Sequence, residues 1–218
     1  MKLIKDSDAA GSDTIGRKAH TLFRLKKLGL PVPDFVVIPV ETIQTLLTEI
    51  LPDSYQPQES VNKITFPDTF FSQLLAALPA AQFFAVRSSS LEEDGTDFSF
   101  AGQFESHLFV SPENLAGKIL SVWNSACSQR VTEYRRHLGL NPSGGIAIIV
   151  QEMIVSEVSG VAFGVNPLNG HLDEKVINAV YGLGEGLVSG ALNADEYVIK
   201  NGQIDTRLAL KTQQLLPV

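Results

Sequence analysis

The sequence has little cysteine and no long apolar run. Cys127 is the single cysteine among 218 residues, so no disulfide can form within the chain, and a reducing compartment fits this composition. No stretch approaches the roughly 20 consecutive apolar residues that a membrane-spanning helix needs. The N-terminal residues also lack the apolar segment of a signal peptide. These absences predict a cytoplasmic protein with no membrane partner.

Positive charge is in the minority. Aspartate and glutamate total 24 against 17 lysines and arginines, which gives a formal net charge of −7. Nucleic-acid-binding domains usually carry a basic stripe, so this balance argues against nucleic acid as a partner. A small anionic ligand remains compatible, because it needs only a local cluster of hydrogen-bond donors.

Several motifs of common enzyme classes are missing. There is no Walker A loop and no G-x-S-x-G nucleophile turn. The YGLGEG segment would need glycine at position 187 to match a dinucleotide fingerprint, and Leu187 stands there. The four histidines show no metal-ligand spacing, so no metal site is predicted. They are His20, His107, His137 and His171.

The order of apolar patterns predicts an α+β chain in two lobes. Helical spacing precedes residue 150, and uninterrupted apolar runs of strand length occur at 35–38 and 146–150. After residue 150 short strands dominate, and Asn201-Gly202 is the strongest hairpin turn. We therefore predict a helix-rich lobe at 1–150 and a strand-rich lobe at 151–218. The helical patterns lie near residues 16–28, 43–50, 68–78 and 111–138.

Arg87 ends a short apolar strand and is followed by hydroxyl residues, acids and glycine, which we expect to form a loop. Arginine offers a permanent charge and a bidentate fork for oxyanions. Small residues also let backbone N–H groups approach phosphate oxygens closely. Two interpretations stay open: a loop that holds phosphate, or a twisted hairpin in which Arg87 pairs with the acids at 92–94.

Lys18 and Glu185 are two further candidates. Lys18 lies in the first turn of the first predicted helix, where a cation opposes the helix dipole unless an anion is also bound. A solvated surface lysine is the alternative. The basic residues Arg130, Arg135 and Arg136 are interpreted as a solvated helix face. Each candidate is weak alone, and together with Arg87 they suit a phosphate or a nucleotide.

Five stretches, in order and covering almost the whole chain, resemble one known family. They are GRKAHTLFRLKKLGLPVPDFVVIP, AVRSSSLEEDGTDFSFAGQFESHLFV, VWNSACSQRVTEYRR, IAIIVQEMIVSEVSGVAFGVNPLNG and AVYGLGEGLVSGALNADEYVI. They are similar to blocks of the N-terminal nucleotide-binding domain shared by phosphoenolpyruvate synthase, pyruvate phosphate dikinase and rifampin phosphotransferase. The resemblance implies an ATP-grasp-like fold of two lobes with the nucleotide between them.

The resemblance also implies roles for particular residues. Lys18 and Arg87 would be the catalytic side chains that clamp the phosphates of ATP. Glu152 and Met153 would give backbone contacts to adenine, and Glu185 would bind the ribose hydroxyls. A loop at 99–103 would close over the phosphates with backbone donors. Its residues with this role are Ser99, Ala101, Gly102 and Gln103.

The reaction implied by the resemblance needs parts that this sequence does not contain. ATP is split to AMP and phosphate, and a phosphoryl group passes through a histidine on a swivelling domain to pyruvate or another acceptor. Neither that domain nor the acceptor-binding domain is present. The carboxylate for Mg²⁺ and a closing Q-x-R strand are expected beyond Val218, so we expect an incomplete second lobe with an exposed sheet edge or a homodimer contact.

Three departures from the family pattern are visible, and alternatives follow from them. Arg17 replaces a glycine beside the phosphate lysine, Thr21 replaces an asparagine, and Phe163-Gly164 replaces Phe-Thr. The chain alone is expected to be incomplete for catalysis. The alternative hypotheses are a catalytically silent nucleotide-binding or interaction module, and a general anion-binding domain.

Overall fold

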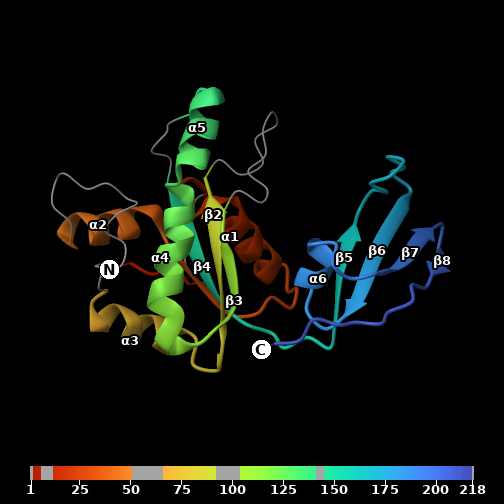
Figure 1. The fold of residues 1–218 in the computed structure, drawn as a ribbon, viewed down its shortest axis with the longest axis horizontal. Coiled ribbons are helices and arrows are strands. Elements are labelled where there is room, and N and C mark those ends of the chain that lie inside the picture. Colours follow the sequence, from red (N-terminus) through yellow and green to blue (C-terminus); the bar gives the residue numbers. More distant parts are fainter. Residues whose placement is uncertain (1, 6–11, 51–65, 92–103, 141–144, 218) are drawn as a thin grey trace. The chain divides into compact units, whose positions relative to one another are not determined.

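The chain folds into two compact units, Met1–Met153 and Ile154–Val218, which are described separately (Figure 1). The computed structural model describes residues 2–5, 12–50, 66–91, 104–140 and 145–217. Both units combine helices with an antiparallel sheet, which confirms the predicted α+β class. Across these described ranges, every helix is too short or too polar to cross a membrane.

The first unit is built on a four-stranded antiparallel sheet of order β1-β4-β2-β3. The two central strands, β4 and β2, are buried along nearly their whole length, and in β4 this burial accounts for an uninterrupted apolar run. Both predicted strand runs at 35–38 and 146–150 are confirmed. The strands are β1 (Phe35–Ile38), β2 (Phe84–Ser90), β3 (Ser106–Val110) and β4 (Ile146–Glu152).

Helices cover both faces of this sheet. On one face α1 (Ser12–Lys27) packs through Ile15 and Ala19 on Phe35, Val37, Ala147 and Ile149. On the other face α3 (Asp68–Ala77) and α4 (Leu115–Ala126) pack on Val36, Ile38, Phe84, Val86 and Ile148. Figure 1 shows α4 crossing the sheet in front of β2 and β4. The remaining helices of this unit are α2 (Val40–Ile50), the short 3₁₀ helix η2 (Pro112–Asn114) and α5 (Gln129–His137).

The prediction of a loop directly after Arg87 is wrong for the three serines. Strand β2 continues through Ser88, Ser89 and Ser90, all buried, which lie opposite Ile148, Ala147 and Ile146 of β4. The strand ladder pairs the backbone here, and small hydroxyl side chains fit beneath the helices on either face. The hydroxyl residues are therefore part of the core.

The predicted helix at 111–138 is broken into η2, α4 and α5. Ser128 caps α5 by accepting the backbone N–H of Val131 at 3.4 Å, and this local bond competes with a continuous helix. The interpretation of Arg135 as a solvated residue is wrong, because its side chain is 1% exposed. Its guanidinium donates to the carbonyl oxygen of Ala126 at 3.2 Å, bracing α5 against α4.

The second unit is an antiparallel sheet of order β5-β6-β7-β8 with one short helix, α6 (Glu185–Val188). Asn201 and Gly202 have φ of 50° and 76° and join β7 to β8 in the predicted hairpin. The chain then returns so that Leu215 forms a β-bridge with Gly182. The strands are β5 (Val158–Phe163), β6 (Glu174–Tyr181), β7 (Asp195–Lys200) and β8 (Gln203–Arg207).

Candidate functional site

Lys18 lies just after a break in α1. At Gly16 the backbone leaves the helical region, with φ of 75° and ψ of 168°, and the helix resumes with Arg17 and the half-buried Lys18. A positive φ favours glycine, because a Cβ atom would be strained there. A Cβ atom at this position would also overlap the carbonyl oxygen of Ser89. The start of the helix that carries Lys18 therefore packs in direct contact with β2.

Arg87 lies on the sheet face that α1 covers. It is opposite Ile149, and Ser89 is opposite Ala147, and both of these partners belong to the core cluster beneath α1. Side chains alternate along a strand, so Arg87 and Ser89 share this face. Arg87 is half-buried and forms no ion pair with any residue that the structure describes. The acids at 92–94, its alternative partners, lie outside the described residues.

One hydrogen bond connects the two segments that carry the candidate cations Lys18 and Arg87. The backbone N–H of Ala19 donates to Oγ of the buried Ser89 at 3.1 Å. Lys18 directly precedes Ala19, and Arg87 lies two residues before Ser89, about 7 Å along the strand. The first unit thus anchors Lys18 and Arg87 near one another through its own core.

Glu152 and Met153 lie at the end of β4. The N–H of Glu152 donates to the carbonyl oxygen of Asp34 at 2.8 Å, and that of Met153 donates to Phe83 at 3.0 Å. Both amide donors are therefore used within the first unit. The carbonyl groups are the backbone atoms through which these residues could contact a base. The predicted phosphate loop of Ser99, Ala101, Gly102 and Gln103 lies outside the described residues.

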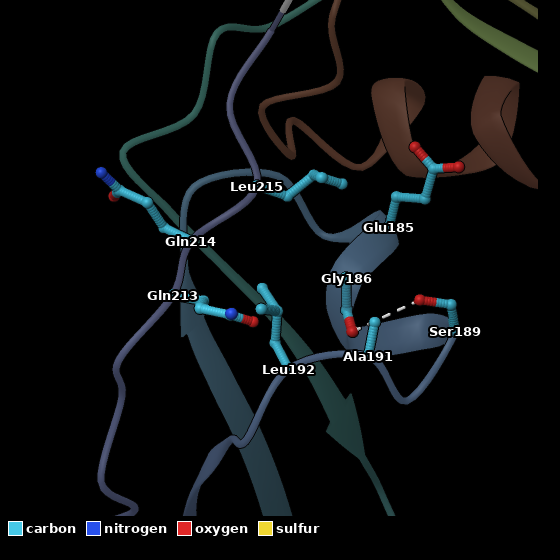
Figure 2. Close-up of a pocket in the computed structure, with 8 residues that line it drawn as sticks. All are labelled: Glu185, Gly186, Ser189, Ala191, Leu192, Gln213, Gln214 and Leu215. Atoms are coloured by element: carbon cyan, nitrogen blue, oxygen red, sulfur yellow. Dashed lines mark hydrogen bonds between the residues drawn. The ribbon is translucent and has the colours of Figure 1, made fainter.

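Glu185 is the exposed first residue of α6 and lines an open hollow of about 520 Å³ in the second unit. Figure 2 shows that the side chain of Gln213 points toward Leu192, whereas that of Gln214 points away. The return of the C-terminal segment brings both glutamines to the hollow that Glu185 also lines. The sequence patterns missed this neighbourhood, because a long-range contact leaves no local periodicity.

One group of metal-ligand residue types occurs among the described residues, at the β6 end of the second unit. Ligand atoms of His171, Asp173 and Glu174 lie within 4.8 Å of one another. The Lys200 ammonium, however, lies 3.1 Å from each of the two carboxylates. Hydrogen bonds from Asn169, His171, Asn166 and Lys200 hold the pKa of Glu174 well below its usual range. The ammonium of Lys200 thus already supplies the positive charge that a metal ion would bring to these carboxylates.

The combination of helices with two antiparallel sheets is consistent with an α+β nucleotide-binding domain. Comparison with known proteins gives the particular family. Residues 12–215 match the AMP/ATP-binding domain of pyruvate phosphate dikinase, and the chain belongs to this family. The resemblance seen in the five sequence blocks is confirmed. The hypothesis of a dikinase-type ATP-binding domain is supported, and the alternative of a catalytically silent nucleotide-binding or interaction module is not favoured.

Curated relatives include several phosphotransferases. The chain is 31% identical over 204 residues to a prodigiosin synthesizing transferase of Serratia marcescens, an alignment covering 88% of this chain and 23% of that protein. It is 33% identical over 172 residues to a rifampicin phosphotransferase of Streptomyces sviceus, covering 77% and 19%. It is 42% identical over 122 residues to a probable phosphoenolpyruvate synthase of Pyrococcus horikoshii, covering 55% and 15%. The chain thus spans about a quarter or less of the length of these relatives.

Proposed function

We propose that this chain is the ATP-binding part of a dikinase-type phosphotransferase, in which Lys18 and Arg87 clamp the phosphates of ATP. The observation that carries the proposal is the anchoring of both residues to one face of the first unit through the Ser89–Ala19 hydrogen bond. Two fixed cations suit the charge on a transferred phosphoryl group, because preorganised donors cost no reorganisation when charge develops.

The remaining candidate residues are proposed to bind the ribose, the adenine and further phosphate oxygens of ATP. We propose that the lobes at 1–150 and 151–218 each contribute residues to the binding of the nucleotide, as the resemblance to an ATP-grasp fold implies. Glu185, exposed beside its hollow, accepts hydrogen bonds from the ribose hydroxyls. The carbonyl groups of Glu152 and Met153 contact adenine, since their amides are already used. Ser99, Ala101, Gly102 and Gln103 supply backbone donors over the phosphates.

The proposed reaction splits ATP so that AMP and phosphate are released. The other phosphoryl group passes to a histidine of a swivelling domain, and from there to pyruvate or another acceptor. Relatives about four times longer than the matched segment support such additional domains. We further propose a cytoplasmic location and a homodimer contact through the edge strand β8, whose five residues are all exposed.

Mg²⁺ is proposed as the partner of ATP, because it neutralises charge on the phosphates in phosphoryl transfer. Among the described residues, the one group of three possible metal ligands, at His171, Asp173 and Glu174, is paired with the ammonium of Lys200. No role in the reaction is therefore assigned to that group.

Titration calorimetry with ATP tests the proposal. A hydrogen bond to a charged group contributes about 1.5–3 kcal/mol, so Lys18→Ala and Arg87→Ala should each raise the Kd for ATP about 10- to 100-fold. Lys118→Ala on α4 and Arg136→Ala on α5 remove exposed side chains of the same types and should leave the Kd unchanged. Equal affinity in all four variants would rule out the phosphate clamp.

A further inference from the structure

Ser89 caps the N-terminal end of α1 after its break, a role that a residue next to the helix usually has. The first N–H groups of a helix have no partner within the helix, and a cap side chain normally accepts one at the second or third position. Counted from the break at Gly16, Ala19 is the third residue, and its N–H is the one that Ser89 accepts at 3.1 Å. Glycine has no side chain for this task. A strand residue 70 positions away therefore caps the helix.

A second contact fixes the same junction. Gly16 approaches Ser89 so closely that a Cβ atom would overlap both its carbonyl oxygen and its Oγ atom. Ser89 itself is 0% exposed and is paired with Ala147 of β4. The backbone before Lys18 and the amide after it are thus both held by one rigid residue of β2.

We propose that Ser89 is a positioning residue for ATP binding, which sets the place of Lys18 relative to Arg87. Ser89 touches no phosphate in this account, and it acts through Ala19 on the turn that presents Lys18. Arg87 and Ser89 share a sheet face two residues apart, so the same strand fixes both cations. This inference rests on the proposed function, because it needs Lys18 to bind phosphate.

A double-mutant cycle in the full chain tests the proposal, with the Kd for ATP as the readout. Ser89→Ala should raise the Kd about tenfold, the effect of losing about one hydrogen bond that orders a binding group. In the Lys18→Ala background, Ser89→Ala should alter the Kd less than about twofold. If Ser89 acts only through Lys18, the effects of the two substitutions on the binding free energy do not add. The control Ser88→Ala removes a hydroxyl that is also buried, at 1% exposure, from the opposite sheet face. It should leave the Kd unchanged in both backgrounds.

The outcomes separate this inference from the proposed function. If Lys18→Ala leaves ATP binding intact, both are overturned. If Lys18→Ala weakens binding but Ser89→Ala has the same effect with and without Lys18, the clamp stands and the positioning role of Ser89 is overturned. Loss of fold stability alone cannot imitate the expected result, because it would not depend on Lys18.

A second variant keeps the test available if Ser89→Ala does not fold. Ser89→Cys keeps an atom at the γ position, and its sulfur is only a weak acceptor. It should reproduce the dependence on Lys18 in the same cycle. Hydrogen exchange gives an independent measure: the Ala19 amide should exchange faster in Ser89→Cys than in the wild-type chain, and unchanged exchange would contradict the proposal.

Discussion

The two units stabilise their sheets in different ways. In the first unit helices cover both faces, and six of the seven residues of β4 are buried. In the second unit every residue of β8 is exposed, and apolar side chains such as Ile204 and Leu210 face solvent. A sheet buries its apolar face only against another layer, so the first unit has a core of its own and the second has little.

Polar pairs connect several elements of the second unit. Glu174 accepts hydrogen bonds from Asn166, Asn169 and Lys200, which connects β6 to β7 and to the turn before β6. Asp195 pairs with Lys211 of the returning C-terminal segment. The comparison teaches that the candidate phosphate residues Lys18 and Arg87 lie on the unit with a buried apolar core, and that the ribose candidate Glu185 lies on the more exposed unit.

The largest difference between the units should come from replacing one isoleucine in each of them by alanine. Ile149→Ala removes a side chain that is 0% exposed beneath α1, and should lower the free energy of unfolding by about 2–5 kcal/mol. Ile204→Ala removes one that is 63% exposed, and should change it by less than about 0.5 kcal/mol. Urea unfolding followed by circular dichroism measures both. Similar losses would remove the contrast between the units.

A smaller effect should come from the junction of α1 with β2. Gly16→Ala combines a backbone φ of 75° with overlap at Ser89, and should cost about 3 kcal/mol of unfolding free energy. Gly29→Ala is the matched control, because its φ is 77° and a Cβ atom there would meet nothing within 4 Å. It should cost only about 1 kcal/mol, from backbone strain alone. Equal costs would show that α1 is not held tightly against Ser89.

The smallest effect should be a pH-dependent one in the second unit. The pKa of Glu174 is lowered from its ordinary value of 4.5, so its ionised form stabilises the folded state above that value and loses this effect as the pH falls below it. Glu174→Gln should therefore lower the melting temperature at pH 7, and the gap to the wild-type chain should narrow progressively as the pH falls below 4.5.

Asp205→Asn is the control for this pH prediction. It removes a carboxylate from the exposed strand β8, away from the hydrogen bonds around Glu174. Its melting temperature should stay close to that of the wild-type chain throughout the same range. A gap for Glu174→Gln that stays constant with pH would contradict the role of its ionised form.

Much of the fold could be predicted from local patterns. The strand at 35–38 and the Asn201-Gly202 hairpin were predictable, because uniform burial and a tight turn each leave a local trace in the sequence. The break before α5 and the burial of Arg135 were not, because they depend on a cap and on a contact with the carbonyl oxygen of Ala126.

The candidate site divides in the same way. Lys18 and Arg87 stand out in the sequence by their charge, one near the start of a helical pattern and the other directly after an apolar run. Ser89 does not stand out, because a serine after an apolar strand is typical of a turn, and its role depends on Gly16 and Ala19, some 70 residues earlier. Side-chain chemistry can be seen in the sequence, whereas the residue that positions it depends on the fold.

Hydrogen exchange of the full chain, with saturating ATP and separately with adenosine, tests the central claim most directly. If Lys18 and Arg87 bind phosphate, ATP should slow exchange of the amides at 17–20, and adenosine should not. The variant carrying both Lys18→Ala and Arg87→Ala should lose this protection. Equal protection by ATP and adenosine, or none by either, would contradict a phosphate site on the first unit.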